Sequence, residues 1–251
     1  MRSDYGMSLV YIFAASRMEA EPVRKITAFS KDQSPARCGE NEVVLMIGGM
    51  GPQNARNKAE AVLGKTPDGC TAPKPHAVLV IGLCGGLTES LSEGRIVAYT
   101  ACGSTEAAKP LLSCSESIVN SFVRQLSSSG IECDRRVGVT SARIATTRDE
   151  RLALARSGAD VVDMESYPIM ECAASAAIPA AVLRVVSDSM DRVLPNLNRA
   201  LNGSGGLDGR KAFMVAVGSP VRTAKLLAAN KRAMQRLSTA LGIVVKAPCF
   251  A

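Results

Sequence analysis

Residues 161–188, VVDMESYPIMECAASAAIPAAVLRVVSD, contain the pattern that decides the fold. The runs Val161–Met164 and Ala180–Ser187 are almost continuously apolar, as expected for strands that are buried on both faces. Between them, Ser166–Ala177 is predicted to be a helix with small residues on one face. A strand, a helix and a second strand in succession are typical of an α/β domain with helices packed on a sheet.

The same alternation extends through most of the chain. Further strands are predicted at Leu9–Ala15, Glu42–Ile47, Ala77–Gly82, Arg95–Thr100 and Arg136–Thr140. Further helices are predicted at Asn54–Leu63, Ser117–Ser128, Thr147–Arg156 and Val221–Leu241. We expect one α/β domain over residues 1–251, with a mobile loop at about 194–210, where asparagine and glycine are frequent.

Composition excludes several classes of protein. With 47% hydrophobic and 21% charged residues, the 251-residue chain is not disordered, collagen-like or of low complexity, and it is long enough to bury one large core. Its apolar runs are shorter than a membrane span of about 20 residues. The apolar stretch Met7–Ala15 is followed directly by Glu19 and Glu21, which favours a core strand over a signal peptide. The default expectation is a cytoplasmic protein.

Cysteine and histidine usage restricts the possible chemistry. The eight cysteines are scattered without a CxxC pair, which favours free buried thiols over disulfides or a metal site. His76 is the single histidine, so neither a zinc centre nor a Ser-His-Asp triad is expected. We expect no metal and no cofactor, and any acid–base chemistry must come from carboxylates.

Positive charge is concentrated at the C-terminal end. The net charge is +7, while the segment from Arg192 onward has ten Lys and Arg against one acid, Asp208, a net +9. A basic segment can indicate nucleic acid or an anionic membrane. The absence of tryptophan and the 4% aromatic content argue against base stacking, so no nucleic-acid partner is expected.

The basic helix at about 220–241 has two interpretations. An apolar stripe can form on one of its faces, from Leu227, Met234, Leu237 and Leu241. The stripe either packs on the protein's own sheet, with the charges in solvent, or lies near a membrane surface.

Two glycine-rich turns follow predicted strands. They are Gly48–Pro52 and Gly82–Gly86, and they make the backbone N–H groups near Gly49, Gly51, Gly85 and Gly86 candidates for binding a nucleophile or anion. Neither turn matches a Walker or dinucleotide-binding motif, and tight-turn geometry explains the glycines equally well. A third group, Gly203–Gly206, follows no strand.

Carboxylates also occur where predicted strands end. Asp163 and Glu165 follow one apolar strand and Asp188 follows another, whereas Glu21 comes shortly after the first strand. Ligands of open α/β sheets bind at the carboxyl ends of strands, so these acids are candidates for general acid–base catalysis. N-capping of the following helix is the alternative role.

Together these landmarks resemble the nucleoside phosphorylase/nucleosidase superfamily of purine and uridine phosphorylases and methylthioadenosine/S-adenosylhomocysteine nucleosidases. The resemblance covers about residues 7–191, through Met18-Glu19-Ala20-Glu21, Gly48–Pro52, Gly82-Leu83-Cys84-Gly85-Gly86-Leu87, Val162-Asp163-Met164-Glu165 and Val186-Ser187-Asp188. The segment Ser187–Pro195 is similar to the hopanoid-associated phosphorylase branch. That narrower likeness implies a large apolar group at the 5′ end of the sugar and a peripheral membrane contact.

The resemblance implies a three-layer α/β/α sandwich around a mixed, mostly parallel sheet, and a homo-oligomer. It also implies cleavage of the N-glycosidic bond of a purine nucleoside or a 5′-modified derivative. In this scheme Asp188 protonates or hydrogen-bonds the base, while Glu165 and Met164 contact the ribose. Glu21 activates water. The base pocket is expected around Ala142, Arg143, Ile144 and Ser187.

Two departures from the family pattern concern the nucleophile. Where family phosphorylases have Arg-Val-Gly before the second glycine turn, this chain has Val80-Ile81-Gly82, and Leu83 replaces the usual Ser or Thr. Both changes remove phosphate ligands, so water is favoured over phosphate, although phosphate as a co-substrate stays open. A non-catalytic nucleoside-binding protein on the same fold is the alternative function.

Overall fold

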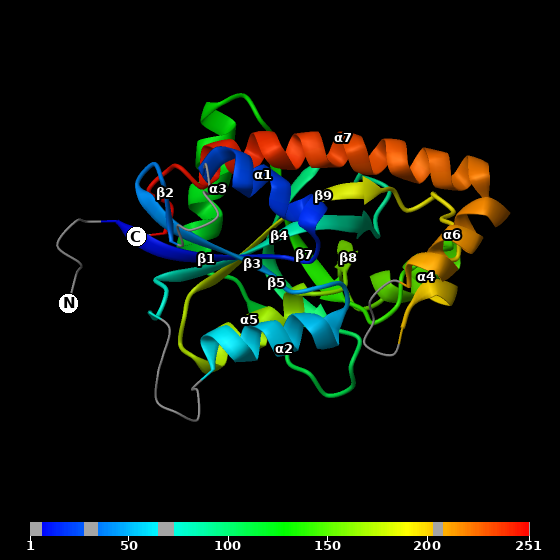
Figure 1. The fold of residues 1–251 in the computed structure, drawn as a ribbon, viewed down its shortest axis with the longest axis horizontal. Coiled ribbons are helices and arrows are strands. Elements are labelled where there is room, and N and C mark those ends of the chain that lie inside the picture. The colour runs from blue at the N-terminus through cyan, green and yellow to red at the C-terminus, as the bar shows by residue number, and fades with distance from the viewer. Residues whose placement is uncertain (1–6, 28–34, 65–72, 203–207, 251) are drawn as a thin grey trace.

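A mixed nine-stranded sheet organises the computed structural model, which describes residues 7–27, 35–64, 73–202 and 208–250 (Figure 1). The seven predicted strands are confirmed as β1 (Ser8–Ala14), β3 (Asn41–Ile47), β4 (Ala77–Gly86), β5 (Ile96–Ser104), β7 (Cys133–Thr140), β8 (Val161–Asp163) and β9 (Ala180–Asp188). Two short strands were not predicted, β2 (Ala36–Cys38) and β6 (Leu112–Ser113). Each pairs antiparallel at an edge of the sheet.

Strand order runs β2-β3-β1-β4-β8-β7-β5-β6, with β9 paired to both β4 and β5. The pairs β1–β3, β1–β4, β4–β9, β5–β7 and β7–β8 are parallel. Because β4 also pairs with β8, strands β4, β9, β5, β7 and β8 close into a ring. The closed ring brings the carboxyl ends of β4, β8 and β9 together.

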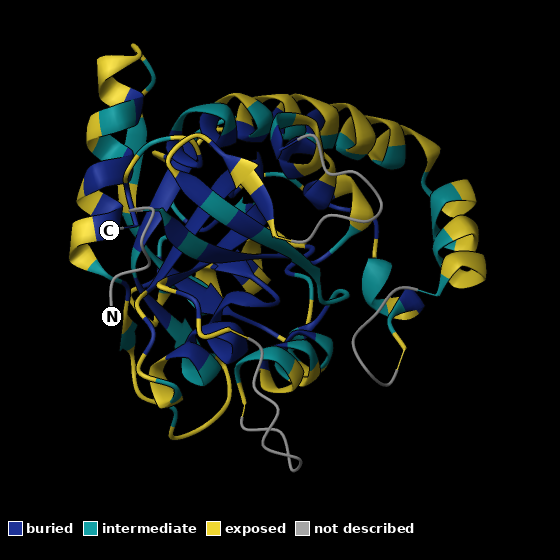
Figure 2. Cartoon of the chain, turned by 60° about the vertical axis from the view of Figure 1, so that its left-hand side comes forward, coloured by how far each residue is buried: buried dark blue, intermediate teal, exposed yellow. Residues whose placement is uncertain are grey.

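Helices cover both faces of this sheet, which confirms the α/β/α sandwich. They are α1 (Arg17–Thr27), α2 (Pro52–Leu63), α3 (Glu116–Ser128), α4 (Arg148–Ala155), α5 (Ser166–Ser175), the 3-10 helix η1 (Leu197–Ala200), α6 (Gly209–Gly218) and α7 (Pro220–Val244). Helices α1 and α7 pack together on one side, and α2 and α5 on the other (Figure 1). Of the strands between them, β1, β4, β8 and β9 are almost entirely buried, whereas β3 and β7 are half-buried (Figure 2).

The predicted loop and C-terminal helix need correction. The loop predicted at about 194–210 contains η1, and α6 begins within it at Gly209, where Asp208 accepts hydrogen bonds from the amides of Arg210 and Lys211. Residues 203–207, with the third glycine group, lie outside the described residues. Leu227 is 63% exposed, so it does not share the buried stripe that includes Leu237 and Leu241.

The structure can also be compared with the predictions about cysteines and membrane spans. All seven cysteines among the described residues are free thiols. No single described helix is long and apolar enough to cross a bilayer, although α6 and α7, bent by 116°, reach that length and composition as a pair.

Gly138 on β7 gives a test of the sheet. A Cβ placed there would lie 2.0 Å from Cε2 of Tyr99, whose buried ring packs on the strand and whose hydroxyl donates to Asp163 over 2.9 Å. We expect Gly138→Ala to lower the free energy of unfolding by about 1–3 kcal/mol, because the ring must move. Urea denaturation measures this.

Gly242→Ala is the matched control. Gly242 lies in α7 with no atom within 4 Å of an added Cβ, so alanine should leave stability unchanged or raise it by about 0.5–1 kcal/mol. Equal stability of the Gly138→Ala variant and the wild type would contradict the described packing of Tyr99.

Candidate active site

A pocket of about 360 Å³ opens where β4, β8 and β9 end, beside the loop that follows β1. Seven of the predicted site residues line it: Gly85, Arg143, Ile144, Met164, Glu165, Ser187 and Asp188. They come from several segments between Gly85 and Asp188, and the closed ring of strands brings these segments together. The pocket is the candidate active site.

Asp188 is directed by an irregularity in β9. The register between β4 and β9 shifts after Cys84, so that Gly85 pairs with Asp188 and Ser187 becomes an extra residue. Such bulges often re-aim a side chain beside an active site. The buried Asp188 carboxylate accepts from Ser187 Oγ at 2.5 Å and from the guanidinium of Arg151.

Gly85 makes room for this carboxylate. A Cβ at that position would lie 3.0 Å from Asp188 Oδ2 and 3.1 Å from Arg151 Nη1. A side chain there would therefore displace the ion pair. Gly85 lies within β4 and not in the predicted turn, and the close approach of the acid leaves little room for a side chain there.

Glu165 is held in the pocket by a backbone amide and an arginine. Its Oε1 accepts from the Gly51 amide at 3.0 Å, and its Oε2 lies 3.4 Å from Nη2 of Arg184. Burial raises the pKa of Glu165 to about 7, and the nearby carboxylates Glu19 and Asp163 add to the rise while Arg184 opposes it.

Asp163 is a structural anchor. Its Oδ1 accepts from the amides of Glu165 and Ser166 at the start of α5 and from the Thr140 hydroxyl, and its Oδ2 accepts from the Tyr99 hydroxyl. Burial would raise the pKa of Asp163, but Arg184 and these hydrogen bonds hold it below its ordinary value. The capping role left open by the sequence therefore belongs to Asp163.

Glu21 does not reach the pocket, which corrects the sequence prediction. Its side chain is 51% exposed and pairs with Lys25 along α1. Glu19 lines the pocket instead, with Oε1 accepting from the Leu83 amide at 3.0 Å. Two residues along a helix turn a side chain by about 200°, so Glu19 and Glu21 point to opposite sides.

A local signal for Glu19 was present in the sequence. Ser16-Arg17-Met18-Glu19 has the spacing of a capping box, in which residues one and four bond each other's amide. In the structure Ser16 Oγ accepts from the Glu19 amide, and Glu19 Oε2 accepts from the Ser16 amide at 3.1 Å. The motif places the start of α1 at the pocket and Glu19 in its first turn.

Four other predicted residues lie near the pocket without lining it. The Gly51 amide is occupied by Glu165, and Gly49 packs against Asn54 with a φ of 90°. The Gly86 carbonyl accepts from Arg151. Ala142 is exposed, whereas its neighbours Arg143 and Ile144 line the pocket.

Two buried arginines were missed by the sequence analysis. Arg184 lies within the apolar run of β9 and Arg151 on α4, and each is 1% exposed. An arginine inside a continuously apolar strand was a usable signal, because such a cation needs buried carboxylate partners. For Arg151 no comparable pattern existed.

Apolar side chains form the outer part of the pocket. Leu194 and Leu197 contribute from the segment around η1, and Leu226 contributes from α7. Met18 and Met50 complete this part. The pocket therefore combines a carboxylate-lined floor with an apolar rim.

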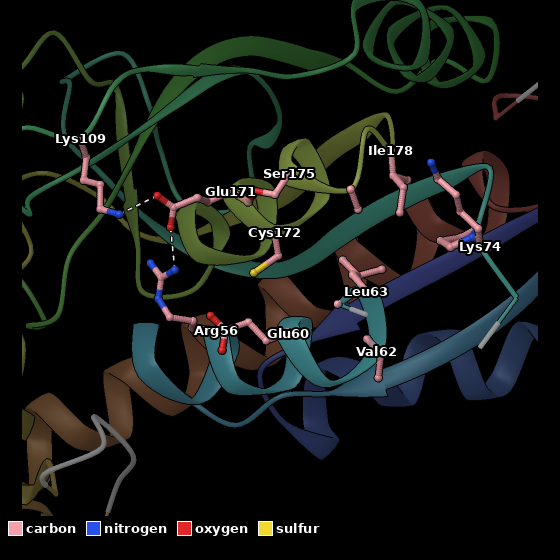
Figure 3. Close-up of a pocket in the computed structure, with 13 residues that line it drawn as sticks. Arg56, Glu60, Val62, Leu63, Lys74, Lys109, Glu171, Cys172, Ser175 and Ile178 are labelled. Carbon is pink, nitrogen blue, oxygen red and sulfur yellow. Dashed lines mark hydrogen bonds and ion pairs between the residues drawn. The ribbon is translucent and has the colours of Figure 1, made fainter. Parts of the chain in front are cut away.

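A larger hollow of about 890 Å³ lies between α2 and α5 (Figure 3). Three of its charged groups form ion pairs, since Glu171 accepts from Lys109 at 2.6 Å and pairs with Arg56 at 2.7 Å. None of the predicted site residues lines it. The carboxylate-lined pocket is therefore the better candidate for the active site.

Comparison with known proteins adds family and fold. Residues 27–203 match a family model described as the phosphorylase superfamily. No curated protein matches the chain in sequence. Among solved structures, a Helicobacter pylori 5′-methylthioadenosine/S-adenosylhomocysteine nucleosidase complexed with a substituted pyrrolidin-3-ol is similar, with a TM-score of 0.73, 14% identity, and 96% of this chain and 98% of that chain covered.

Two further solved structures have the same fold. The corresponding nucleosidase of Neisseria meningitidis, in complex with methylthio-immucillin-A, has a TM-score of 0.73 and 16% identity, covering 96% of this chain and 99% of that one. A futalosine hydrolase of Helicobacter pylori has a TM-score of 0.73 and 14% identity, covering 95% and 97%.

Glu165 should make stability depend on pH. The folded chain keeps its proton up to about pH 7, whereas the unfolded chain loses it near 4.5. Between these values unfolding releases a proton, so the free energy of unfolding should fall as pH rises, by about 3 kcal/mol in total. Urea denaturation at a series of pH values measures the slope.

Glu165→Gln should remove that slope. Glu171→Gln is the matched control, because the ion pairs of Glu171 lower its pKa and place its titration below pH 4.5. This control should lose some stability while keeping the wild-type slope. A wild-type protein with constant stability between pH 5 and pH 7 would contradict the environment described for Glu165.

Proposed function

The chain belongs to the phosphorylase superfamily, and from this we propose that it cleaves the N-glycosidic bond of a purine nucleoside, or of a derivative modified at the ribose 5′ position, with water as the nucleophile. The observation that carries the proposal is the arrangement of Asp188, Glu165 and Glu19 in one pocket. Breaking a ribosyl C–N bond leaves positive charge on the sugar and negative charge on the base. Separate carboxyl groups can serve these two ends.

Asp188 serves the departing base. As the C–N bond breaks, the Asp188 carboxyl group transfers its proton to a ring nitrogen of the base, the bonding electron pair leaves with the base, and the carboxylate that remains pairs with Arg151. Ser187 and Arg151 hold the group in position. Arg143 and Ile144 line the pocket too and would contact the base.

Glu165 and Met164 serve the sugar. A Glu165 carboxylate accepts hydrogen bonds from ribose hydroxyls and stabilises the cationic character that develops at the anomeric carbon. Its pKa of about 7 means that the carboxylate form dominates above neutral pH. Met164 lines the pocket beside it.

Glu19 takes the role predicted for Glu21. Its carboxylate lines the pocket and is fixed by the Ser16 and Leu83 amides. From this position it accepts a proton from the attacking water while the water oxygen bonds to the anomeric carbon.

Electrostatics favour water over phosphate. The backbone amides of Gly51 and Leu83, which could have bound an anion, already donate to Glu165 and Glu19. Among the described residues that line the pocket, the cations are Arg143 and Arg151, and Arg151 is paired with Asp188. A phosphate near the sugar would meet two carboxylates, whereas a neutral water would not.

The apolar rim supports a substituent at the ribose 5′ position. With the base at Asp188 and the hydroxyls at Glu165, the leucines at positions 194, 197 and 226 are available for an apolar group. Burial of such a group contributes about 25 cal/mol per Å² of apolar surface.

Asp188→Asn should reduce turnover by about 10²–10⁴-fold, because the amide cannot supply the proton. Product analysis over a panel of purine nucleosides, with and without phosphate, measures both base and sugar. Free ribose or its 5′-modified form is expected in both conditions. Strict dependence on phosphate, with a sugar 1-phosphate as product, would exclude hydrolysis.

Asp191→Asn is the control for this variant. Asp191 is 66% exposed and pairs with Arg148 near the surface, so its amide should keep full turnover. If the wild type binds nucleosides without turning any of them over, the chain is instead the non-catalytic binding protein that the sequence left as an alternative.

Glu19→Gln and Glu21→Gln separate the two glutamates. Glu19→Gln should lower kcat by about 10²–10⁴-fold with KM little changed, since the amide cannot accept the proton of water. Glu21→Gln should behave as the wild type. Thermal unfolding of both variants separates catalysis from the capping role of Glu19, and a larger loss of turnover in Glu21→Gln would reverse our assignment.

A further inference from the structure

Helix α6 has no buried residue, although six of its ten residues are apolar. Figures 1 and 2 place it at the edge of the molecule, beyond the N-terminal end of α7. Phe213, Met214 and Val217 are 66%, 68% and 59% exposed. Positions i, i+1 and i+4 of a helix share one side, so these three side chains form one apolar face.

The exposed apolar surface continues into α7. Val221 and Leu227 are also more than half exposed, so five of the nine large exposed apolar side chains among the described residues lie between 213 and 227. The C-terminal half of α7 differs, because Leu237, Leu241 and Val244 are buried against the sheet and α1. The first part of α7 contacts the rest of the described chain through Leu226 at the pocket and through the Lys225 carbonyl, which accepts from Arg192, whereas Val221 and Leu227 stay exposed.

Basic side chains surround this apolar surface. Arg210, Lys211, Arg222 and Lys225 are all exposed, and none of them pairs with a carboxylate among the described residues. Between residues 208 and 228 the single acid is Asp208, which caps α6. A hollow of about 370 Å³ between η1 and α6 adds Arg199 beside Lys211.

We propose that α6 and the first two turns of α7 form a docking surface for an anionic phospholipid membrane. The apolar face formed by Phe213, Met214 and Val217 enters the headgroup region, and Arg210, Lys211, Arg222 and Lys225 bind lipid phosphates. Apolar and basic side chains combined on a surface helix are typical of interfacial membrane binding. The proposal does not depend on the reaction in the pocket.

Other occupants fit this surface less well. A symmetric contact with a second copy would place the same cations opposite each other, which costs free energy by repulsion. A nucleic acid would use the positive charge but would leave the apolar face in water, and Phe213 is the single aromatic residue there. A lipid surface satisfies both the apolar and the charged side chains.

Sedimentation of the full chain with vesicles tests the proposal. We expect it to pellet with vesicles of equal parts phosphatidylcholine and phosphatidylglycerol, to bind pure phosphatidylcholine far less, and to be released as salt rises. The triple variant Phe213→Ser, Met214→Ser, Val217→Ser should lower the partition coefficient by about tenfold or more. The double variant Leu111→Ser, Leu152→Ser, which changes exposed apolar residues elsewhere, should bind as the wild type.

A second pair of matched variants tests how far the basic side chains contribute to membrane binding. Changing Arg210, Lys211, Arg222 and Lys225 to glutamine should lower partitioning by about fivefold for each charge removed. Changing Arg24, Lys25, Arg37 and Arg156 to glutamine alters the net charge equally at other exposed positions and should have much less effect. Circular dichroism and nucleoside turnover confirm that each variant is folded.

Three outcomes would overturn the proposal. The wild type could stay in the supernatant with both kinds of vesicle at low salt. The control variants could lose as much binding as the docking-surface variants. Analytical ultracentrifugation could show an oligomer that the Phe213, Met214 and Val217 changes dissociate, in which case a second copy covers the surface.

Discussion

A buried arginine surrounded by carboxylates is the constraint on which the rest of the site depends. Arg184 is 1% exposed within the central strand β9, and it lies near Asp163, Glu165 and Glu19. Three buried carboxylates without a cation would be strongly destabilising, because desolvation of each charge costs several kcal/mol. Gly82 accommodates this arrangement, since a Cβ there would lie 2.5 Å from Glu19 and 2.7 Å from Arg184.

One cation shared by several acids allows each acid a different task. Asp163 uses its oxygens within the fold and anchors the start of α5, so its carboxylate is not available to a ligand. Glu165 lies 3.4 Å from Arg184 and keeps a raised pKa at the pocket. On the other side of β4, Arg151 pairs with Asp188. The two arginines thus hold two separate groups of carboxylates at the pocket.

Two kinds of element build the pocket. The floor residues project from β4, β8 and β9, which pair with one another, whereas the leucines of the rim come from η1 and α7. Helix α7 spans two environments, because its C-terminal half packs on the core and its N-terminal part lies in the open. The same helix therefore links the core to the rim and to the exposed apolar surface.

Periodicity and turn residues were sufficient to predict the seven main strands and the helix between Val161 and Asp188. They also placed Asp188, Glu165 and Met164 at the ends of strands. All of these features depend on neighbouring residues in the chain. The landmarks at 18–21, 48–52, 82–87 and 162–188 also indicated the family, which the match over residues 27–203 shows. The bulge at Ser187 and the buried partners of Arg151 and Arg184 were decided only by tertiary structure. Each of these depends on contacts between segments 19 to 103 residues apart, such as Arg184 with Glu165 and Gly85 with Asp188, and local patterns carry no information on such distances.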